Sequence, residues 1–269
     1  MQIFSQINQD MQLFLAIIFA LICGSFASFV THRLGLGQGL FAANSACPKC
    51  GNKLKPKNLI PLISYFWQKG KCNNCGAKIS ARYPIIEAVF LGGFLTIYFA
   101  LNRKIDGVML LYFAISFCLI SMIIIDLEHY FIPNSLQYIL AILALSLLFV
   151  KGGQSLILSN LKGAFLYLFF AVVLWLFFYF IAKIEAIGID DIKFFFLAGL
   201  ILGQKNFLSF MILSGVFGLI FGGLWQKLKK DETFPFAPAI CSSVFILMLF
   251  EKKIDLIDIA AGLLFFHGF

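Results

Sequence analysis

The sequence predicts an all-α polytopic membrane protein with about eight transmembrane helices and a small four-cysteine zinc domain between the first two. The composition is the first reason: 61% of the 269 residues are hydrophobic and 13% are charged, whereas soluble globular domains are roughly 45–50% apolar. The second reason is that the apolar residues form long runs, which soluble helices of about 11 residues do not need. Two Cys-x-x-Cys pairs in one polar stretch are the third. We therefore expect the lipid bilayer to surround most of the chain.

Eight apolar runs approach or reach the roughly 20 residues that a helix needs to cross the hydrocarbon core. The first follows a segment, Met1–Asp10, that has no Lys or Arg. A cleaved signal peptide starts with basic residues, so we expect this run to stay in the protein. The sixth and eighth runs are shorter than the others. The runs are residues 11–31, 85–101, 107–125, 132–150, 161–182, 192–204, 206–226 and 236–250.

Basic residues in the loops predict the orientation of these spans. The segment 32–84 holds nine Lys or Arg residues, and alternating spans put 14 basic residues on its side and 7 on the other. Cytoplasmic loops carry such an excess, so this segment is expected in the cytoplasm, together with the helix ends that bear Asp126 and Asp191. Both chain ends would then face outward. Topology thus accounts for the net charge of +8, and nucleic acid is not an expected partner.

The chain divides into three predicted parts, of which the middle one is large and polar enough to form a domain outside the lipid. Within it, the apolar stretch 59–67 is expected to fill the interior of the small domain. A substrate-docking surface is the alternative, and a role at the membrane surface also stays open. The three parts are residues 1–31, with the first span, 32–84, the zinc-binding loop, and 85–269, the transmembrane core.

Four cysteines of the middle part have the spacing of a metal site. Cys47 and Cys50 form one Cys-x-x-Cys-Gly knuckle, and Cys72 and Cys75 form another. Two such knuckles aim four soft thiolates at one point, which is typical of tetrahedral zinc. Disulfides are the alternative, but cytoplasmic thiols are kept reduced. Because four thiolates leave no open coordination position, the zinc is predicted to be structural.

Two clusters of small residues predict close helix contacts. Gly24-Ser25-Phe26-Ala27-Ser28 lies in the first run, and Gly218 and Gly222 lie in the seventh. Small residues at helical spacing let the backbones of membrane helices approach closely. We therefore expect another element to pack tightly against each cluster.

Two acidic stretches at the ends of apolar runs need a reason, because a charge in the bilayer costs at least a few kcal/mol. They contain Asp126, and Asp190 with Asp191. When two carboxyls share a site, one keeps its proton while the other stays charged. Such a pair suits aspartic hydrolysis, in which the ionised carboxylate takes a proton from water and the other serves the departing group. Spacing alone leaves snorkelling charges, salt bridges or a proton- or ion-coupled transporter as alternatives.

Taken in order, the motifs resemble those of the prepilin peptidases, also called type IV leader peptidases, over residues 24–238. The family pattern runs Gly-Ser-Phe, paired Cys-x-x-Cys, Tyr-Pro-x-x-Glu, Asp with Ile-Pro downstream, Gly-x-Gly-Asp-x-Lys and Pro-Phe-Gly-Pro. The matching residues are Gly24-Ser25-Phe26, the four cysteines, Tyr83-Pro84-Ile85-Ile86-Glu87, Asp126 with Ile132-Pro133, Gly188-Ile189-Asp190-Asp191-Ile192-Lys193, and Pro235-Phe236-Ala237-Pro238.

The resemblance implies a membrane aspartic endopeptidase whose catalytic residues are Asp126 and Asp191. Such enzymes remove the leader of prepilin or pseudopilin precursors, for type IV pili or type II secretion, at the cytoplasmic face of the bacterial inner membrane. Many also N-methylate the new terminus with S-adenosylmethionine. This methyl donor rests on the resemblance alone, since the sequence has no glycine-rich nucleotide fingerprint. The resemblance also makes Glu87 an expected anchor near the zinc domain, with a plain interfacial acid as the alternative.

Two residues depart from the family pattern. Asp190 replaces the second Gly of Gly-x-Gly-Asp, and Ala237 replaces the Gly of Pro-Phe-Gly-Pro. Asp191 is expected to be the catalytic residue because it precedes x-Lys, as the family's Asp does. Asp190 adds a third carboxylate that could shift the titration of the pair or supply the catalytic group itself.

Overall fold

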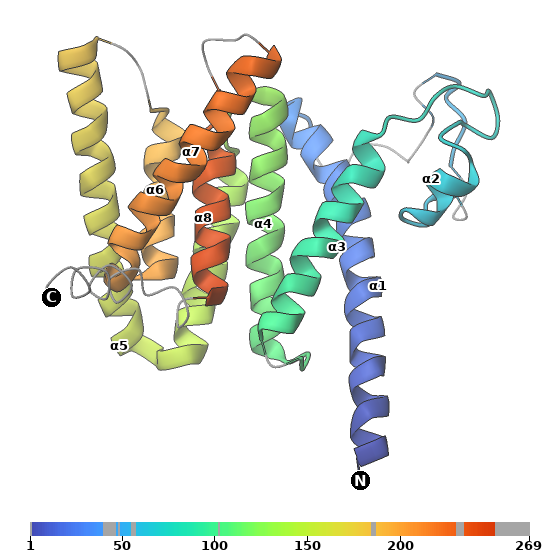
Figure 1. Ribbon diagram of the computed structural model, residues 1–269, viewed down its shortest axis with the longest axis horizontal. Coiled ribbons are helices and arrows are strands. Elements are labelled where there is room, and N and C mark those ends of the chain that lie inside the picture. The colour runs from blue at the N-terminus through green and yellow to red at the C-terminus, as the bar shows by residue number, and fades with distance from the viewer. Residues whose placement is uncertain are drawn as a thin grey trace, which may run out of the picture. The chain divides into compact units, whose positions relative to one another are not determined.

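The computed structural model describes residues 2–39, 47, 49–54, 58–101, 103–183, 187–229 and 234–250. Among these residues there is no strand, so the predicted all-α fold is confirmed. Parts of the predicted zinc loop, residues 40–46, 48 and 55–57, lie outside the described chain. The elements are α1 (Gln2–Gly35), α2 (Ile63–Trp67), α3 (Arg82–Ala100), α4 (Gly107–His129), α5 (Asn134–Phe177), η2 (Phe178–Ala182), α6 (Ile189–Leu202), η3 (Gln204–Asn206), α7 (Phe207–Lys229) and α8 (Ala237–Phe250) (Figure 1).

The predicted apolar runs are helical over nearly all of their residues. The fourth and fifth runs share one element, because α5 continues through residue 153 into η2. Gly153 has non-helical torsion angles, φ 61° and ψ −151°, which glycine adopts without the steric cost of a Cβ. Figure 1 shows the result: α5 consists of two arms joined by a sharp bend.

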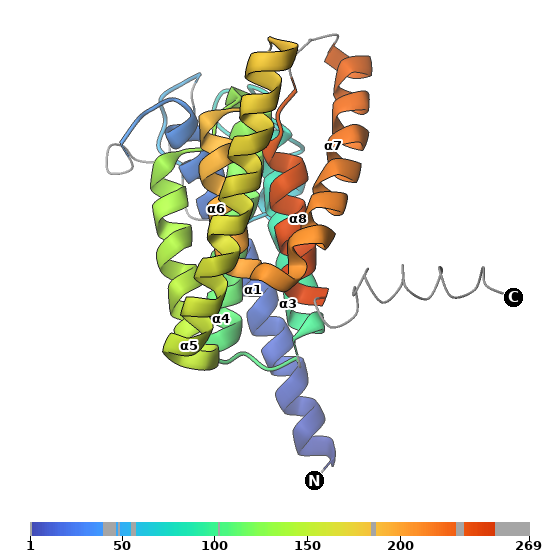
Figure 2. The ribbon, with the colours of Figure 1, turned by 90° about the vertical axis from the view of Figure 1, so that its left-hand side faces the viewer.

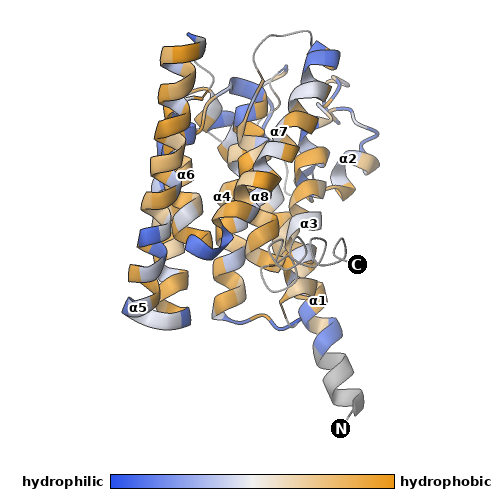
Figure 3. Ribbon diagram, turned by 60° about the vertical axis from the view of Figure 1, so that its left-hand side comes forward, coloured by the Kyte–Doolittle hydropathy of each residue, from blue (hydrophilic) through white to orange (hydrophobic). Residues whose placement is uncertain are grey.

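Within the described residues, five helices are long and apolar enough to cross a membrane. The longest has 48 residues. At 1.5 Å per residue, its length along both arms of the bend is roughly 72 Å, more than twice the thickness of about 30 Å of the hydrocarbon core. The chain is therefore a multi-pass membrane protein, while the total of eight spans stays a prediction because α6 and α8 have 14 residues each. Figure 3 shows hydrophobic residues along most of the helical surface. The five helices are Gln9–Gly35, Arg82–Ala100, Gly107–His129, Asn134–Ile181 and Gln204–Lys229.

The chain forms two compact units, residues 1–121 and the residues from 122 onward, with the boundary inside α4. In the first unit α1 packs along α3. A Cβ on Gly24 would lie 2.9 Å from the Cα of Glu87, so the two backbones touch at a point where only glycine fits. The predicted close contact of the Gly24 cluster is confirmed. This contact also fixes the height of Glu87 along α1.

In the second unit α5 packs against α6, and α7 packs against α8 (Figure 2). A Cβ on Gly199 of α6 would lie 2.7 Å from the Cα of Ala164 in α5, so these helices are also in backbone contact. The amide of Asn160 in α5 donates to the carbonyl of Leu200, at 2.9 Å, and satisfies an end of α6. A second small-residue prediction is confirmed too, because Gly218 lies against the Phe236 ring. The contacts of Gly199 and Asn160 hold the last turns of α6 against α5.

Candidate functional site

The four-cysteine cluster, Cys47, Cys50, Cys72 and Cys75, is assembled in the first unit. The four Sγ atoms all lie within 4.8 Å of one another, and those of Cys47 and Cys75 are 3.9 Å apart. In a tetrahedral site with Zn–S bonds of about 2.3 Å, the sulfurs are about 3.8 Å apart. The described cysteines are all free thiols. The cluster therefore fits one metal ion that prefers soft ligands.

Two matching turns build the cluster. In the first, the N–H of Gly51 donates to the carbonyl of Cys47 at 2.8 Å; in the second, the N–H of Gly76 donates to that of Cys72 at 2.9 Å. Both glycines have left-handed backbone angles, φ 68° and 69°, a conformation that glycine adopts at little cost. The Gly of each Cys-x-x-Cys-Gly knuckle is therefore what turns the chain back after the second thiol.

The surroundings of two of the four thiols, Cys50 and Cys72, favour the thiolate form that a metal requires. The backbone N–H of Asn52 and the side-chain amide of Asn74 lower the pKa of Cys50 to about 7. Backbone N–H groups of Cys75 and Asn74 lower the pKa of Cys72 in the same way. Hydrogen bonds to sulfur stabilise its negative charge. Against the effect of the Ala77 backbone N–H, burial and the neighbouring thiols raise the pKa of Cys75 to about 11.

Glu87 of α3 holds the loop that carries the cluster. Its side chain is 8% exposed, and Oε2 accepts a hydrogen bond of 2.7 Å from the backbone N–H of Leu62. Leu62 has a positive φ of 59°, which is uncommon for a non-glycine residue. Glu87 thus makes the contact with the zinc loop that its resemblance to the family motif led us to expect.

Asp126 lies in the last turns of α4 and is 5% exposed. Its Oδ2 accepts a 2.8 Å hydrogen bond from the backbone N–H of Ala237, the first residue of α8. The donor is a backbone group, so any residue except proline supplies it. Ala237 is fully buried and has no positive φ. The replacement of the family's glycine by alanine is therefore compatible with this geometry.

Asp191 lies in the first turn of α6. Its Oδ2 accepts a hydrogen bond of 3.2 Å from the backbone N–H of Gly188, the residue that precedes the helix. An acidic residue at this position also interacts favourably with the helix dipole. Burial and the nearby Asp126 carboxylate raise the pKa of Asp191 to about 7, against the effect of the Gly188 N–H.

Asp126 and Asp191 line the same cavity, which has a volume of about 340 Å³. Ligand pockets in proteins range from about 300 to 1,000 Å³. Aromatic side chains, Tyr130 and Trp175, line its walls, and Asp190 also reaches it. The structure therefore brings together two acidic residues that are 65 positions apart in the sequence.

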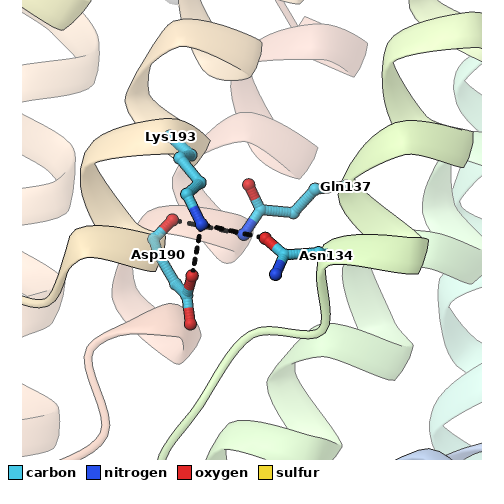
Figure 4. A network of polar contacts seen from close by, with 4 residues as sticks. All are labelled: Asn134, Gln137, Asp190 and Lys193. Atoms are coloured by element: carbon cyan, nitrogen blue, oxygen red, sulfur yellow. Dashed lines mark hydrogen bonds and ion pairs between the residues drawn. The ribbon is translucent and has the colours of Figure 1, made fainter.

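Asp190 belongs to a polar network that joins the beginnings of α5 and α6 (Figure 4). The Nζ of Lys193 lies 2.9 Å from Oδ1 of Asp190 and 2.9 Å from Oδ1 of Asn134. The side-chain amide of Gln137 donates to the backbone carbonyl of Asp190 at 3.3 Å. The ammonium of Lys193 thus offsets the third carboxylate, which distinguishes Asp190 from Asp191.

Sequence reasoning missed three contacts of this site. The Ala237 N–H was part of a recognised motif, but its partner lies 111 residues away. Asn134 and Gln137 lie near the start of the predicted run 132–150, and nothing in their spacing ties them to residues 190–193. The available signal was one pair of polar residues, Asn134 and Gln137, three positions apart at the start of an apolar run.

Residues 18–101 match the bacterial peptidase A24 N-terminal domain, and residues 112–223 match the type IV leader peptidase family. No solved structure matches.

Three curated relatives, each named prepilin leader peptidase/N-methyltransferase, match 88% of this chain. The protein of Bacillus subtilis is 32% identical, with 94% of its length covered. Those of Pseudomonas aeruginosa and Vibrio cholerae are each 31% identical, with 90% and 96% covered. These names give no support to the transporter alternative. By these matches, the chain belongs to the type IV leader peptidase family.

Proposed function

We propose that this protein is an aspartic endopeptidase that removes the leader peptide from prepilin or pseudopilin precursors. The observation that carries the proposal is the cavity of about 340 Å³ that both Asp126 and Asp191 line. The names of the relatives and the family match support the same activity. A carboxyl pair in one pocket is the equipment that metal-free peptide hydrolysis needs.

The chemistry follows from a pair with one proton. The ionised carboxylate takes a proton from water while the water oxygen bonds to the scissile carbonyl carbon, and the protonated carboxyl donates to the carbonyl oxygen. The C–N bond then breaks, and the amine nitrogen leaves with a proton from the pair. We assign the role of acid to Asp191, because burial and the neighbouring Asp126 carboxylate raise its pKa and so favour its protonated form. Asp126 is then the base, oriented by the Ala237 N–H.

The zinc loop, residues 32–84, is proposed as a separate small domain that a structural zinc folds. Four thiolates would fill the coordination shell of this ion, so it would give the loop its shape and take no part in hydrolysis. The excess of basic residues supports a cytoplasmic position for the loop and for the carboxyl pair. The leader of a precursor would then meet the pair on the same side.

Methylation of the new N-terminus from S-adenosylmethionine is proposed on the names of the relatives. The product of leader removal is a free amine, which is the acceptor that such a transfer needs. The methyl group would pass from the donor's sulfonium to that nitrogen, which gives up a proton.

The test uses purified full-length protein, a prepilin peptide and mass measurement of the products. Asp126→Asn and Asp191→Asn should each abolish loss of the leader, while Asp190→Asn, the matched control on the neighbouring position, should retain it. Leader removal by either of the first two variants would refute the catalytic assignment. A further methyl increment that requires added S-adenosylmethionine would establish the transferase, and its absence would restrict the protein to the peptidase.

A further inference from the structure

The short helix α2 presents large apolar side chains that no part of the described chain covers. Ile63 is 55% exposed, Phe66 71% and Trp67 80%, and α2 contains no buried residue. The expectation that the stretch 59–67 fills the zinc domain is therefore wrong for these three residues. Exposed aromatic side chains grouped on one short helix indicate an interaction surface.

The orientation of α2 is fixed by the zinc loop. Tyr65, on the other side of the helix, packs over the following turn, where a Cβ on Gly70 would lie 3.2 Å from its hydroxyl. The N–H of Gly70 donates to the carbonyl of Tyr65 at 2.9 Å and closes the helix. Since Tyr65 faces the loop, Phe66 and Trp67 must face outward.

The depth of α2 follows from its tether to α3. Leu62, directly before α2, is bound to Glu87, the sixth residue of the 19-residue helix α3. At 1.5 Å per residue, Glu87 lies roughly 8 Å inside the start of a helix about 28 Å long. The hydrocarbon core is about 30 Å thick, so α2 begins beside the first turns of a spanning helix, as Figure 1 also shows. The tether therefore holds α2 beside the end of α3 that lies toward one membrane boundary.

The positive charge around α2 complements the negative charge of an anionic lipid surface. The segment 32–84 has nine Lys or Arg residues and no Asp or Glu. Lys69 and Lys71, two and four residues after the end of α2, are exposed. Aromatic rings flanked by basic residues are typical of segments that lie in the membrane interface.

We propose that α2 is an interfacial membrane anchor: Ile63, Phe66 and Trp67 enter the headgroup region of the bilayer, and Lys69 and Lys71 contact the phosphates of anionic lipids. The anchor holds the four-cysteine cluster at a constant height above the membrane. Its site on the chain is separate from the carboxyl pair, so the proposal stands without the proposed peptidase activity.

The test measures where Trp67 lies, in full-length protein reconstituted into vesicles of phosphatidylcholine and phosphatidylglycerol. The emission of Trp67 is obtained by subtracting the spectrum of Trp67→Phe from that of the wild type, so the two other tryptophans cancel. Phosphatidylcholine brominated near the headgroup should remove most of this difference emission, while iodide in the water should remove little. Trp225→Phe, treated in the same way, reports a tryptophan of α7 as the matched control.

Two outcomes would overturn the proposal. Strong quenching by iodide without quenching by brominated lipid would place Trp67 in water. Protection from both quenchers would show that protein, such as a second copy or a bound substrate, covers the helix.

A second experiment tests the contact with anionic lipid. Quenching by brominated lipid should weaken in vesicles without phosphatidylglycerol, and the double variant Lys69→Gln with Lys71→Gln should abolish that dependence on phosphatidylglycerol. Unchanged dependence in this double variant would refute the lipid-phosphate contact.

Discussion

The hydrogen bond from the Ala237 N–H to Asp126 is open to a sharp test, because one substitution removes the donor and leaves both side-chain identities of the carboxyl pair intact. Ala237 is the first residue of α8, a position at which helices accept proline readily. Ala237→Pro therefore deletes the N–H while the helix can still begin at the same place. Its ring Cδ also takes the space of the lost hydrogen, so Asp126 must move away.

The size of the effect follows from the burial of both partners. Asp126 is 5% exposed, Ala237 is fully buried, and the N···Oδ2 distance is 2.8 Å. A hydrogen bond to a charged group contributes about 1.5–3 kcal/mol. With a factor of ten for about 1.4 kcal/mol, turnover of a prepilin peptide should fall by at least roughly tenfold.

The assay follows leader removal by mass, alongside thermal unfolding to show that the variant is folded. Ala237→Gly is the matched control: it restores the residue of the family motif, keeps the N–H and should cleave at nearly the wild-type rate. Full activity of a folded Ala237→Pro protein would refute the argument that this N–H orients Asp126. Equal losses in the proline and glycine variants would instead assign the effect to the buried methyl group.

Three further predictions concern the zinc loop and the third carboxylate. Glu87→Ala leaves the Leu62 N–H without its acceptor, at a cost of about 1–3 kcal/mol, so hydrogen exchange at Leu62 should become roughly 5- to 150-fold faster. Glu87→Gln is the control, because it keeps an acceptor for this N–H. Unchanged exchange in the alanine variant would contradict the tether between Glu87 and Leu62. The alkaline limb of the pH–activity profile should lie near pH 7, where Asp191 loses its proton. Lys193→Met should move this limb to higher pH by exposing Asp191 to the uncompensated charge of Asp190, whereas Asp190→Asn should move it to lower pH. Shifts of both variants in the same direction would contradict this electrostatic reasoning. A zinc chelator should release one metal ion per chain and make the zinc loop sensitive to protease, whereas a loop that resists proteolysis without metal would not need zinc to fold.

The class of fold was predictable because its determinants are local. Hydropathy acts over about 20 consecutive residues, and each predicted run is helical in the structure. The four-cysteine cluster was predictable for the same reason, since each knuckle is closed by hydrogen bonds within five residues, as between Gly51 and Cys47. The α5 bend was missed because two runs read as separate helices are joined by helical residues on both sides of Gly153.

The sequence by itself thus determined the membrane class, the helices, the cysteine cluster and, through a family resemblance, which acids to examine. Only the tertiary structure decided how those acids are held. The Ala237 N–H that binds Asp126 lies 111 residues further along the chain. Asn134, which shares the Lys193 ammonium with Asp190, lies 59 residues before Lys193. Hydropathy also could not tell whether Trp67 is covered, because an apolar residue looks the same in a core and at a lipid surface. Contacts between distant segments depend on how whole helices pack, and no local pattern records that.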